Sequence, residues 1–177
     1  MEIEILNFIQ QNLENPVFSS ILIFFTNIVE HGEVWILTGI IMLITKKYRK
    51  AGLLLLITLV ITFVSSELII KNLVCRPRPF LENPDIQLMI SPPHGYSFPS
   101  SHSAVSFASA TVIFYFNKKF GVAAYVVATL TAFSRLYLYV HYPTDVLGGI
   151  VLGVAIAIIV ISVYNSRKIL SKIKRNN

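Results

Sequence analysis

The sequence predicts an all-α membrane protein, namely a polytopic bundle of five to six transmembrane helices with a short interfacial helix at the N-terminus. Three observations favour this fold class. Of the 177 residues, 54% are hydrophobic and only 14% are charged. Several apolar stretches approach the roughly 20 residues that a helix needs to cross a bilayer. Polar segments, most of them short, separate these stretches, which is the pattern of a chain that crosses the membrane repeatedly.

Four spans are clear, and two shorter apolar segments precede them. The clear spans are residues 51–70, 102–116, 120–140 and 146–164. Segments 17–29 and 34–45 are each short for a full crossing, and the polar run from Glu30 to Glu33 separates them. They form either two tilted helices or one broken element, so the span count is six or five.

The chain divides into three parts around this bundle. We expect residues 1–15 to lie on the membrane surface as an amphipathic helix, because acidic residues stand where a signal peptide carries basic ones. Residues 16–166 form the membrane-embedded domain, which leaves no room for a separate soluble domain. Residues 167–177 form a basic cytoplasmic tail. The single cysteine, Cys75, excludes an intramolecular disulfide.

The basic residues indicate how the bundle is oriented. The net charge is +6, but the basic residues are distributed unevenly along the chain. In a membrane protein this distribution indicates orientation and does not predict nucleic-acid binding. Most of the Lys and Arg residues fall on one side, which the positive-inside rule makes cytoplasmic. They are Lys46, Lys47, Arg49, Lys50, Lys118, Lys119, Arg167, Lys168, Lys172, Lys174 and Arg175. We therefore expect a multi-pass plasma-membrane protein with a cytoplasmic C-terminus. Its oligomeric state is not predicted.

Nearly all the unusual polar groups fall at the opposite, extracytoplasmic end. They are four cations, two histidines, one carboxylate and two serines at the start of a helix: Lys71, Arg76, Arg78, Arg135, His102, His141, Asp145, Ser100 and Ser101. Charged groups near helix ends in a bilayer are costly unless they are paired, reach the interface or serve a function. The sequence therefore predicts a functional site at this end.

Two kinds of ligand suit such a cluster, a metal ion and a phosphate. His102, His141 and Asp145 are plausible metal ligands. Four nearby cations would repel a metal ion, whereas arginine and lysine both bind phosphate well. A helix that begins at Ser100 or Ser101 adds free backbone N–H groups and the positive end of its dipole to the same anion. Phosphate is therefore favoured, and a metal site is the alternative.

Two histidines beside a phosphate permit a division of labour. One can attack phosphorus if a carboxylate orients its ring and stabilises the positive charge that develops. The other can protonate the leaving oxygen and later deprotonate water. Asp145 lies four residues after His141, so His141 is the better nucleophile and His102 the better acid and base.

Three short blocks in this region resemble the signature of a known family. They are KNLVCRPRP (Lys71 to Pro79), PSSH (Pro99 to His102) and SRLYLYVHYPTD (Ser134 to Asp145). In this order and with these internal spacings, they resemble the motif of the type 2 phosphatidic acid phosphatase superfamily. Its members are membrane lipid phosphatases, and its soluble relatives include vanadium haloperoxidases. One position departs from the pattern, because Ser101 stands where the family usually has glycine.

The resemblance implies a role for each matching residue. His141 forms a phosphohistidine, Asp145 supports it and His102 protonates the leaving group. The phosphate-binding positions match Lys71, Arg78, Ser100, Ser101 and Arg135. The resemblance implies no metal and no other cofactor. The added Cβ of Ser101 is expected to crowd the phosphate slightly, because glycine lets a backbone N–H approach an anion more closely.

The expected function is hydrolysis of a membrane lipid phosphate or pyrophosphate that enters the site sideways from the bilayer. Among the substrates that the resemblance implies, undecaprenyl pyrophosphate fits an outward-facing site best. Phosphatidylglycerophosphate and phosphatidic acid are alternatives, because the loop 80–98 encodes no recognisable headgroup. A protein of another class, a lipid-phosphate transporter or resistance factor without catalysis, would account for the cations but not for the pairing of His141 with Asp145.

Several polar residues near this cluster have simpler interpretations. Glu67, four residues before Lys71, is expected to pair with it along the helix. Arg76 lies outside the family motif and is expected to touch lipid headgroups alone. His31 and His94 are expected to be ordinary interfacial histidines.

Small and aromatic residues predict further packing features. Gly149 and Gly153 form a G-x-x-x-G on the last span, which is expected to pack closely within the bundle. Three tyrosines are expected to form a belt at the membrane interface, namely Tyr137, Tyr139 and Tyr142.

Overall fold

A computed structural model describes residues 1–30, 32–83 and 86–176, with residues 167–176 described by their main chain alone. All regular structure in these ranges is helical, as the sequence predicts. The prediction for His31 falls outside the described residues. So do the side chains of the predicted basic tail.

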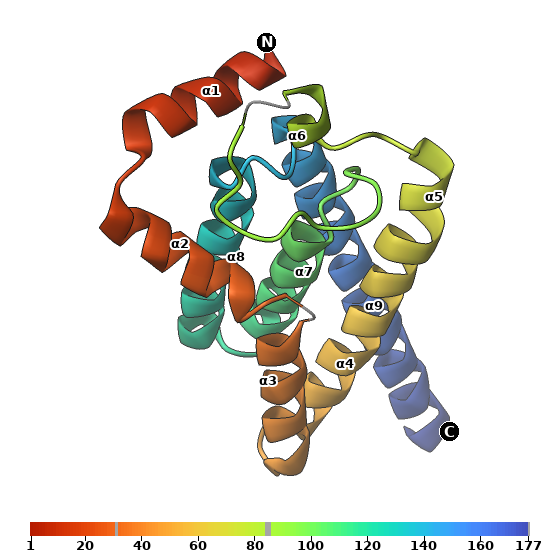
Figure 1. Cartoon of the computed structure of the whole chain (residues 1–177). Coiled ribbons are helices and arrows are strands. Elements are labelled where there is room, and N and C mark those ends of the chain that lie inside the picture. The colour runs from red at the N-terminus through yellow and green to blue at the C-terminus, as the bar shows by residue number, and fades with distance from the viewer. Residues whose placement is uncertain (31, 84–85, 177) are drawn as a thin grey trace.

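Helices follow one another along the whole described chain (Figure 1). In order they are α1 (Glu2–Leu13), α2 (Pro16–Asn27), α3 (Glu33–Ile44), α4 (Arg49–Phe63), η1 (Val64–Ile70), α5 (Lys71–Val74), α6 (Pro79–Glu82), α7 (Ser101–Phe116), α8 (Lys118–Tyr137) and α9 (Pro143–Asn176). The segment η1 is π-helical and joins α4 to α5 without a break.

The centre of the bundle is α7, which packs against α4, α8 and α9. Most of its fully buried residues are small, namely Ser103, Ala104, Ser106, Ala108, Ser109 and Ala110. Small side chains let the neighbouring helices approach the α7 backbone closely. On the α3 side, Trp35 Nε1 donates a hydrogen bond to Ser106 Oγ at 3.1 Å. Because neighbouring helices pack against α7 on several sides, its N-terminus has a defined position in the bundle.

The G-x-x-x-G of α9 packs within the bundle, as predicted. A Cβ on Gly149 would lie 2.3 Å from the main-chain oxygen of Ser100, and one on Gly153 would lie 2.1 Å from that of Ala104. Neither distance is possible without a shift of backbone, so only glycine permits this approach of α9 to α7. Gly149 therefore helps to place Ser100, one of the predicted phosphate-binding residues.

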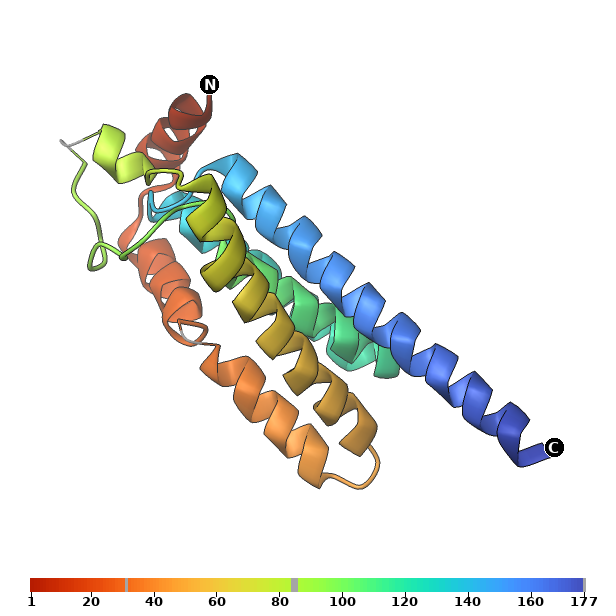
Figure 2. The same ribbon diagram turned by 90° about the vertical axis from the view of Figure 1, so that its right-hand side faces the viewer.

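Three helical segments within the described residues are long and apolar enough to cross a membrane, namely Arg49–Glu82, Lys118–Tyr137 and Pro143–Ser166. The helices α2 and α3 are apolar but shorter. They are separate helices that follow one another from the α1 end of the bundle to the opposite end (Figures 1 and 2).

The two ends of the bundle differ in composition. The helices α1 and α6, the starts of α7 and α9 and the end of α8 gather at one end, called the α1 end below (Figure 1). The α3–α4 turn, with Lys46 and Lys47, and the α7–α8 turn, with Lys118 and Lys119, lie toward the other end (Figure 2). The predicted site residues and the predicted cytoplasmic lysines are thus at opposite ends.

The helix α1 lies across the α1 end and packs on the loop between α8 and α9. Leu6 is fully buried against Tyr139, and Ile9 packs in a cluster with Tyr137. The hydroxyl of Tyr139 donates a hydrogen bond to Asn7 Oδ1 at 2.7 Å. One face of α1 is therefore fixed to the loop that carries His141.

The predicted tyrosine belt is wrong. The three side chains are buried, with exposed fractions of 0%, 0% and 3% for Tyr137, Tyr139 and Tyr142. The reason is that α1 and α2 cover this end of α8. The hydroxyl groups of Tyr137 and Ser19 on α2 share a hydrogen bond of 2.6 Å, which anchors α2 to the same end.

Candidate active site

The start of α7 is held by its own N-cap and by α9. Ser100 is the N-cap, and its Oγ accepts hydrogen bonds from the N–H and the Oγ of Ser103, at 3.5 and 3.0 Å. The Ser100 N–H donates to the main-chain oxygen of Asp145 at 2.9 Å. The helix begins at Ser101, as the sequence predicts, so the positive end of its dipole lies beside the start of α9.

His141 and Asp145 face each other where α9 begins. His141 precedes the helix, and Asp145 lies in its first turn. His141 Nδ1 is 3.6 Å from Asp145 Oδ2, slightly beyond hydrogen-bonding distance, and both side chains are buried. The same Oδ2 accepts the Tyr142 N–H at 2.8 Å. The carboxylate is therefore held by the turn and directed at the imidazole.

The second ring nitrogen of His141 indicates which tautomer the ring adopts. Arg78 Nη1 lies 3.3 Å from His141 Nε2. A guanidinium has only N–H donors, so Nε2 must accept this hydrogen bond with its lone pair. The proton of a neutral ring is thereby assigned to Nδ1, on the Asp145 side. A histidine nucleophile needs an unprotonated ring nitrogen toward the phosphate and a carboxylate on the other side of the ring, and His141 has both.

Arg78 is fixed beside this ring by main-chain acceptors. Its side chain is buried, Nε donates to the Gly95 oxygen, and Nη1 donates to the Val140 oxygen, both at 3.0 Å. Carbonyl oxygens orient the guanidinium without neutralising its charge. Arg78 therefore contributes a full positive charge next to His141 Nε2.

Burial and neighbouring cations lower the pKa of His141 well below its ordinary value of 6.5. Burial is the largest cause, and the positive charges of Arg78, Arg135 and Lys71 add to it. The ring is therefore neutral near neutral pH, which agrees with the tautomer that Arg78 requires.

Lys71 pairs with Glu67, as their spacing predicts. The distance from Lys71 Nζ to Glu67 Oε1 is 2.6 Å, and Lys71 is almost fully buried. Glu67 lies in the π-helical segment η1, and such segments are frequent at functional sites. Ser101 is near enough to influence the same carboxylate, but among the described residues its Oγ has no hydrogen-bond partner. The residue that replaces the family glycine is therefore next to an acidic group.

Arg135 and His102 complete the cluster. Arg135 is buried near the end of α8 and donates from Nη1 to Thr26 Oγ1 of α2. Among the described residues, Arg135 Nε and His102 Nε2 are buried atoms without a hydrogen-bond partner, as befits groups that bind a ligand. His102 interacts electrostatically with four predicted site residues: Arg135, His141, Lys71 and Arg78. The predicted residues thus converge, while their chemical roles remain predictions.

The interpretation of Arg76 as a headgroup contact alone is wrong. Arg76 Nη1 donates to Asp145 Oδ1 at 2.8 Å and to Thr144 Oγ1 at 2.6 Å, and Nη2 donates to Glu2 Oε2 at 2.6 Å. Glu2 was not among the predicted site residues. Its contact with Arg76 joins residues far apart in the chain, and no local motif signals such a pair.

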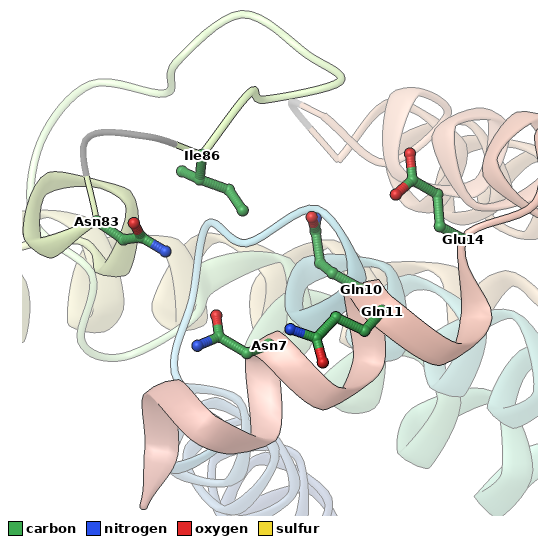
Figure 3. A pocket seen from close by; sticks show the side chains of 6 residues that line it. All are labelled: Asn7, Gln10, Gln11, Glu14, Asn83 and Ile86. Carbon is green, nitrogen blue, oxygen red and sulfur yellow. The ribbon is translucent and has the colours of Figure 1, made fainter.

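The candidate metal ligands His102, His141 and Asp145 do not form a metal-ligating group. Among the side chains described in residues 1–30, 32–83 and 86–166, no three from His, Cys, Asp or Glu lie close enough together to hold a metal ion. A hollow of about 290 Å³ at the α1 end has a different lining, with amide side chains from α1 and the loop after α6 (Figure 3). It lies outside the histidine and arginine cluster.

Comparisons with known proteins agree with the three sequence blocks. The family model described as PAP2 superfamily matches residues 36–169. An undecaprenyl-diphosphatase from Sulfolobus acidocaldarius is 36% identical over 121 residues, which cover 68% of this chain and 58% of that protein. The undecaprenyl-diphosphatase BcrC of Bacillus subtilis is 31% identical over 146 residues, covering 80% and 72%. The match therefore spans less than two thirds of the Sulfolobus protein.

A solved structure has the same fold. The crystal structure of LpxE from Aquifex aeolicus superimposes with a TM-score of 0.81 at 25% identity, covering 91% of this chain and 94% of that one. The matched family region contains every predicted site residue and most of the helical bundle. The chain is a membrane protein that belongs to the PAP2 superfamily.

Proposed function

We propose that this protein is a lipid pyrophosphate phosphatase that acts through a phosphohistidine on His141. The observation that carries the proposal is the state of the His141 ring, whose Nε2 lone pair faces Arg78 while Nδ1 faces Asp145. A protein that only bound phosphate would need the cations but not this pair. The family membership and the relatives named undecaprenyl-diphosphatase support the same reading.

In the first step, His141 Nε2 attacks the terminal phosphorus of the substrate. An N–P bond forms, the bond from phosphorus to the bridging oxygen breaks, and His102 gives its proton to the leaving lipid monophosphate. The imidazole becomes positively charged, and Asp145 stabilises it from the Nδ1 side. The charge on the phosphoryl oxygens is stabilised by Lys71, Arg78, Ser100, Ser101 and Arg135, together with the N-terminus of α7.

In the second step, water replaces His141 on phosphorus. His102, now without its proton, accepts a proton from the water as it attacks. The N–P bond breaks, inorganic phosphate leaves, and His141 regains its lone pair. The cycle needs no metal ion, because the cations and the helix N-terminus supply the positive charge that a metal would otherwise provide.

The proposed substrate is undecaprenyl pyrophosphate, and it reaches the site from the outer leaflet. Two relatives carry the name undecaprenyl-diphosphatase. The assay is release of inorganic phosphate in detergent from this lipid, from phosphatidylglycerophosphate and from phosphatidic acid, with a metal chelator present. We expect fastest release from the pyrophosphate. Loss of all activity with chelator would contradict the metal-free reaction, and no release from any lipid would contradict catalysis.

We propose five membrane crossings, with α2 and α3 acting together as one broken crossing and the α1 end outside the cytoplasm. The basic turns at Lys46 and Lys118 favour this orientation by the positive-inside rule. The single cysteine, Cys75, is exposed at the α1 end and provides a direct test. A membrane-impermeant maleimide is expected to label Cys75 in intact cells. Labelling only after permeabilisation would show the inverse topology.

The pH dependence of kcat/KM should follow the depressed pKa of His141. Because burial and cations lower this pKa below 6.5, Nε2 stays unprotonated as the pH falls through 6.5. Activity is lost only when the pH falls below the pKa in the folded protein. Arg78→Gln removes one cation, so its acid limb is expected at higher pH than that of the wild type. If the two enzymes lose activity at the same acidic pH, the assignment of this pH dependence to His141 is wrong. Ionisation of the substrate affects both enzymes equally, so it cannot produce a difference between them.

A further inference from the structure

A chain of charged contacts leads from the first turn of α1 to the His141–Asp145 pair. Glu2 Oε2 accepts from Arg76 Nη2 at 2.6 Å, and Arg76 Nη1 donates to Asp145 Oδ1 at 2.8 Å. Asp145 Oδ2, the other oxygen of the same carboxylate, faces His141. Glu2 and Asp145 are thus joined through a single guanidinium.

We propose that Glu2 and Arg76 are positioning residues for the His141–Asp145 pair, and that α1 acts as a clamp on the start of α9. The inference rests on the proposed function, because it assigns Asp145 its orienting task toward His141. Glu2 lies outside the three sequence blocks of the family signature, and Arg76 lies inside the first block at a position to which the resemblance assigns no role.

Arg76 is suited to orient Asp145. The carboxylate has no exposed surface, so each of its oxygens needs a partner. Oδ2 has the Tyr142 N–H, while Oδ1 has Arg76 Nη1. The guanidinium also stacks over the Tyr142 ring, with Cζ 3.8 Å from the ring centroid, which restricts its rotation. If Arg76 were removed, the carboxylate could rotate about its bond to Cβ and lose its direction toward the imidazole.

Glu2 holds both Arg76 and the first turn of α9. Its Oε1 accepts from the N–H and the Oγ1 of Thr144, at 3.1 and 2.7 Å. The Thr144 N–H belongs to the first turn of a helix, where backbone donors lack partners within the helix. Glu2 therefore caps α9 from another helix, a favourable place for negative charge.

The ionisation of Glu2 is consistent with this capping. Partial burial opposes the charged form, but hydrogen bonds from Thr144 and from Arg76, together with the charge of Arg76, outweigh it. The pKa of Glu2 is therefore lowered from its ordinary value, and the carboxylate is ionised near neutral pH.

Packing keeps Glu2 in place. Leu6 and Ile9 of α1 are buried against the loop that carries His141, whereas Ile5 and Phe8 on the other face are exposed. The helix thus has one face on the loop and one apolar face available to lipid. The clamp consists of the buried face of α1 together with the ionic contact at Glu2.

The test compares two glutamates of the same helix. Glu2→Gln keeps the shape of the side chain but weakens the contacts with Arg76 and Thr144. Glu4→Gln is the matched control, because Glu4 is highly exposed and pairs with the N-terminal amine of Met1. We expect Glu2→Gln to lower kcat about 3- to 10-fold with KM unchanged, and Arg76→Gln to lower it about 10- to 100-fold. Glu4→Gln should retain wild-type kcat.

A double variant separates positioning from general damage. If Glu2 acts largely through Arg76, adding Glu2→Gln to Arg76→Gln should slow the enzyme by less than Glu2→Gln slows the wild type, because only the Thr144 contact is left to lose. Arg76→Lys should recover part of kcat, because it restores a positive charge. The inference is overturned if the fold-losses in kcat of Glu2→Gln and Arg76→Gln multiply in the double variant. It is also overturned if Glu2→Gln and Glu4→Gln have equal effects, or if the variants raise KM and leave kcat unchanged.

A spectroscopic measurement does not depend on turnover. The nitrogen-15 shifts of the His141 ring report its tautomer and its contact with Asp145, and His141→Gln assigns the signal. Glu2→Gln and Arg76→Gln should both move this signal, while Glu4→Gln should leave it in place. A signal that neither variant moves overturns the clamp even if the enzyme is active. If the variants move the His141 signal but the wild-type enzyme releases phosphate from no lipid, the clamp is supported and the proposed function is rejected.

Discussion

Replacing His141 by alanine is expected to lower kcat by roughly 10⁴-fold or more, because the variant lacks Nε2, the atom proposed to accept the phosphoryl group. His141 Nε2 carries no proton and faces Arg78, and general acid catalysis by His102 cannot replace a missing nucleophile. Phosphate release from undecaprenyl pyrophosphate measures the loss.

The matched control for this change is another histidine. The side chain of His94 is exposed in the loop before α7, so His94→Ala is expected to keep kcat close to that of the wild type. Lipid binding by the His141→Ala protein should persist, because Lys71, Arg78 and Arg135 remain. A His141→Ala enzyme that retained more than a tenth of the wild-type kcat would exclude the phosphohistidine route.

Asp145→Asn is expected to lower kcat by roughly 10³- to 10⁴-fold while leaving KM within a few-fold of the wild type. An amide has nearly the same shape as the carboxylate but carries no charge and presents an N–H group. If this group faces His141 Nδ1, it favours the tautomer with the proton on Nε2, which removes the lone pair that attacks phosphorus. The variant also leaves Arg76 without its ionic partner.

The nitrogen-15 spectrum of His141 distinguishes the two causes of such a loss. A proton moved from Nδ1 to Nε2 indicates the wrong tautomer, whereas an unchanged tautomer indicates loss of charge stabilisation alone. A kcat within 10-fold of the wild type would show that Asp145 is dispensable. In that case the pairing with His141 would have no catalytic meaning.

That the predicted site residues lie near one another was predictable from the sequence, because each belongs to a short block with internal spacing. In the block from Ser134 to Asp145, a turn before α9 brings His141 and Asp145 together through residues that are close in sequence. The Lys71–Glu67 pair follows from helical periodicity in the same way. The order of apolar stretches likewise predicted the four main helices.

Contacts across the bundle were not predictable, since they depend on how distant helices pack. The burial of Tyr137, Tyr139 and Tyr142 depends on α1 and α2, which cover the end of α8. The roles of Glu2 and Arg76 depend on the same placement of α1. An aromatic cluster near a helix end suggests a membrane interface in a sequence, and only the tertiary fold shows that another helix covers it.

The most direct test of the phosphohistidine mechanism is a rapid-quench experiment with undecaprenyl pyrophosphate that carries radioactive phosphorus in its terminal group. During the first turnover, the mechanism predicts protein-bound label that is stable in alkali and labile in acid, located by peptide mapping at His141 and absent from the His141→Ala protein. Label on another residue would contradict the mechanism. So would the absence of any protein-bound label while the lipid monophosphate is being formed.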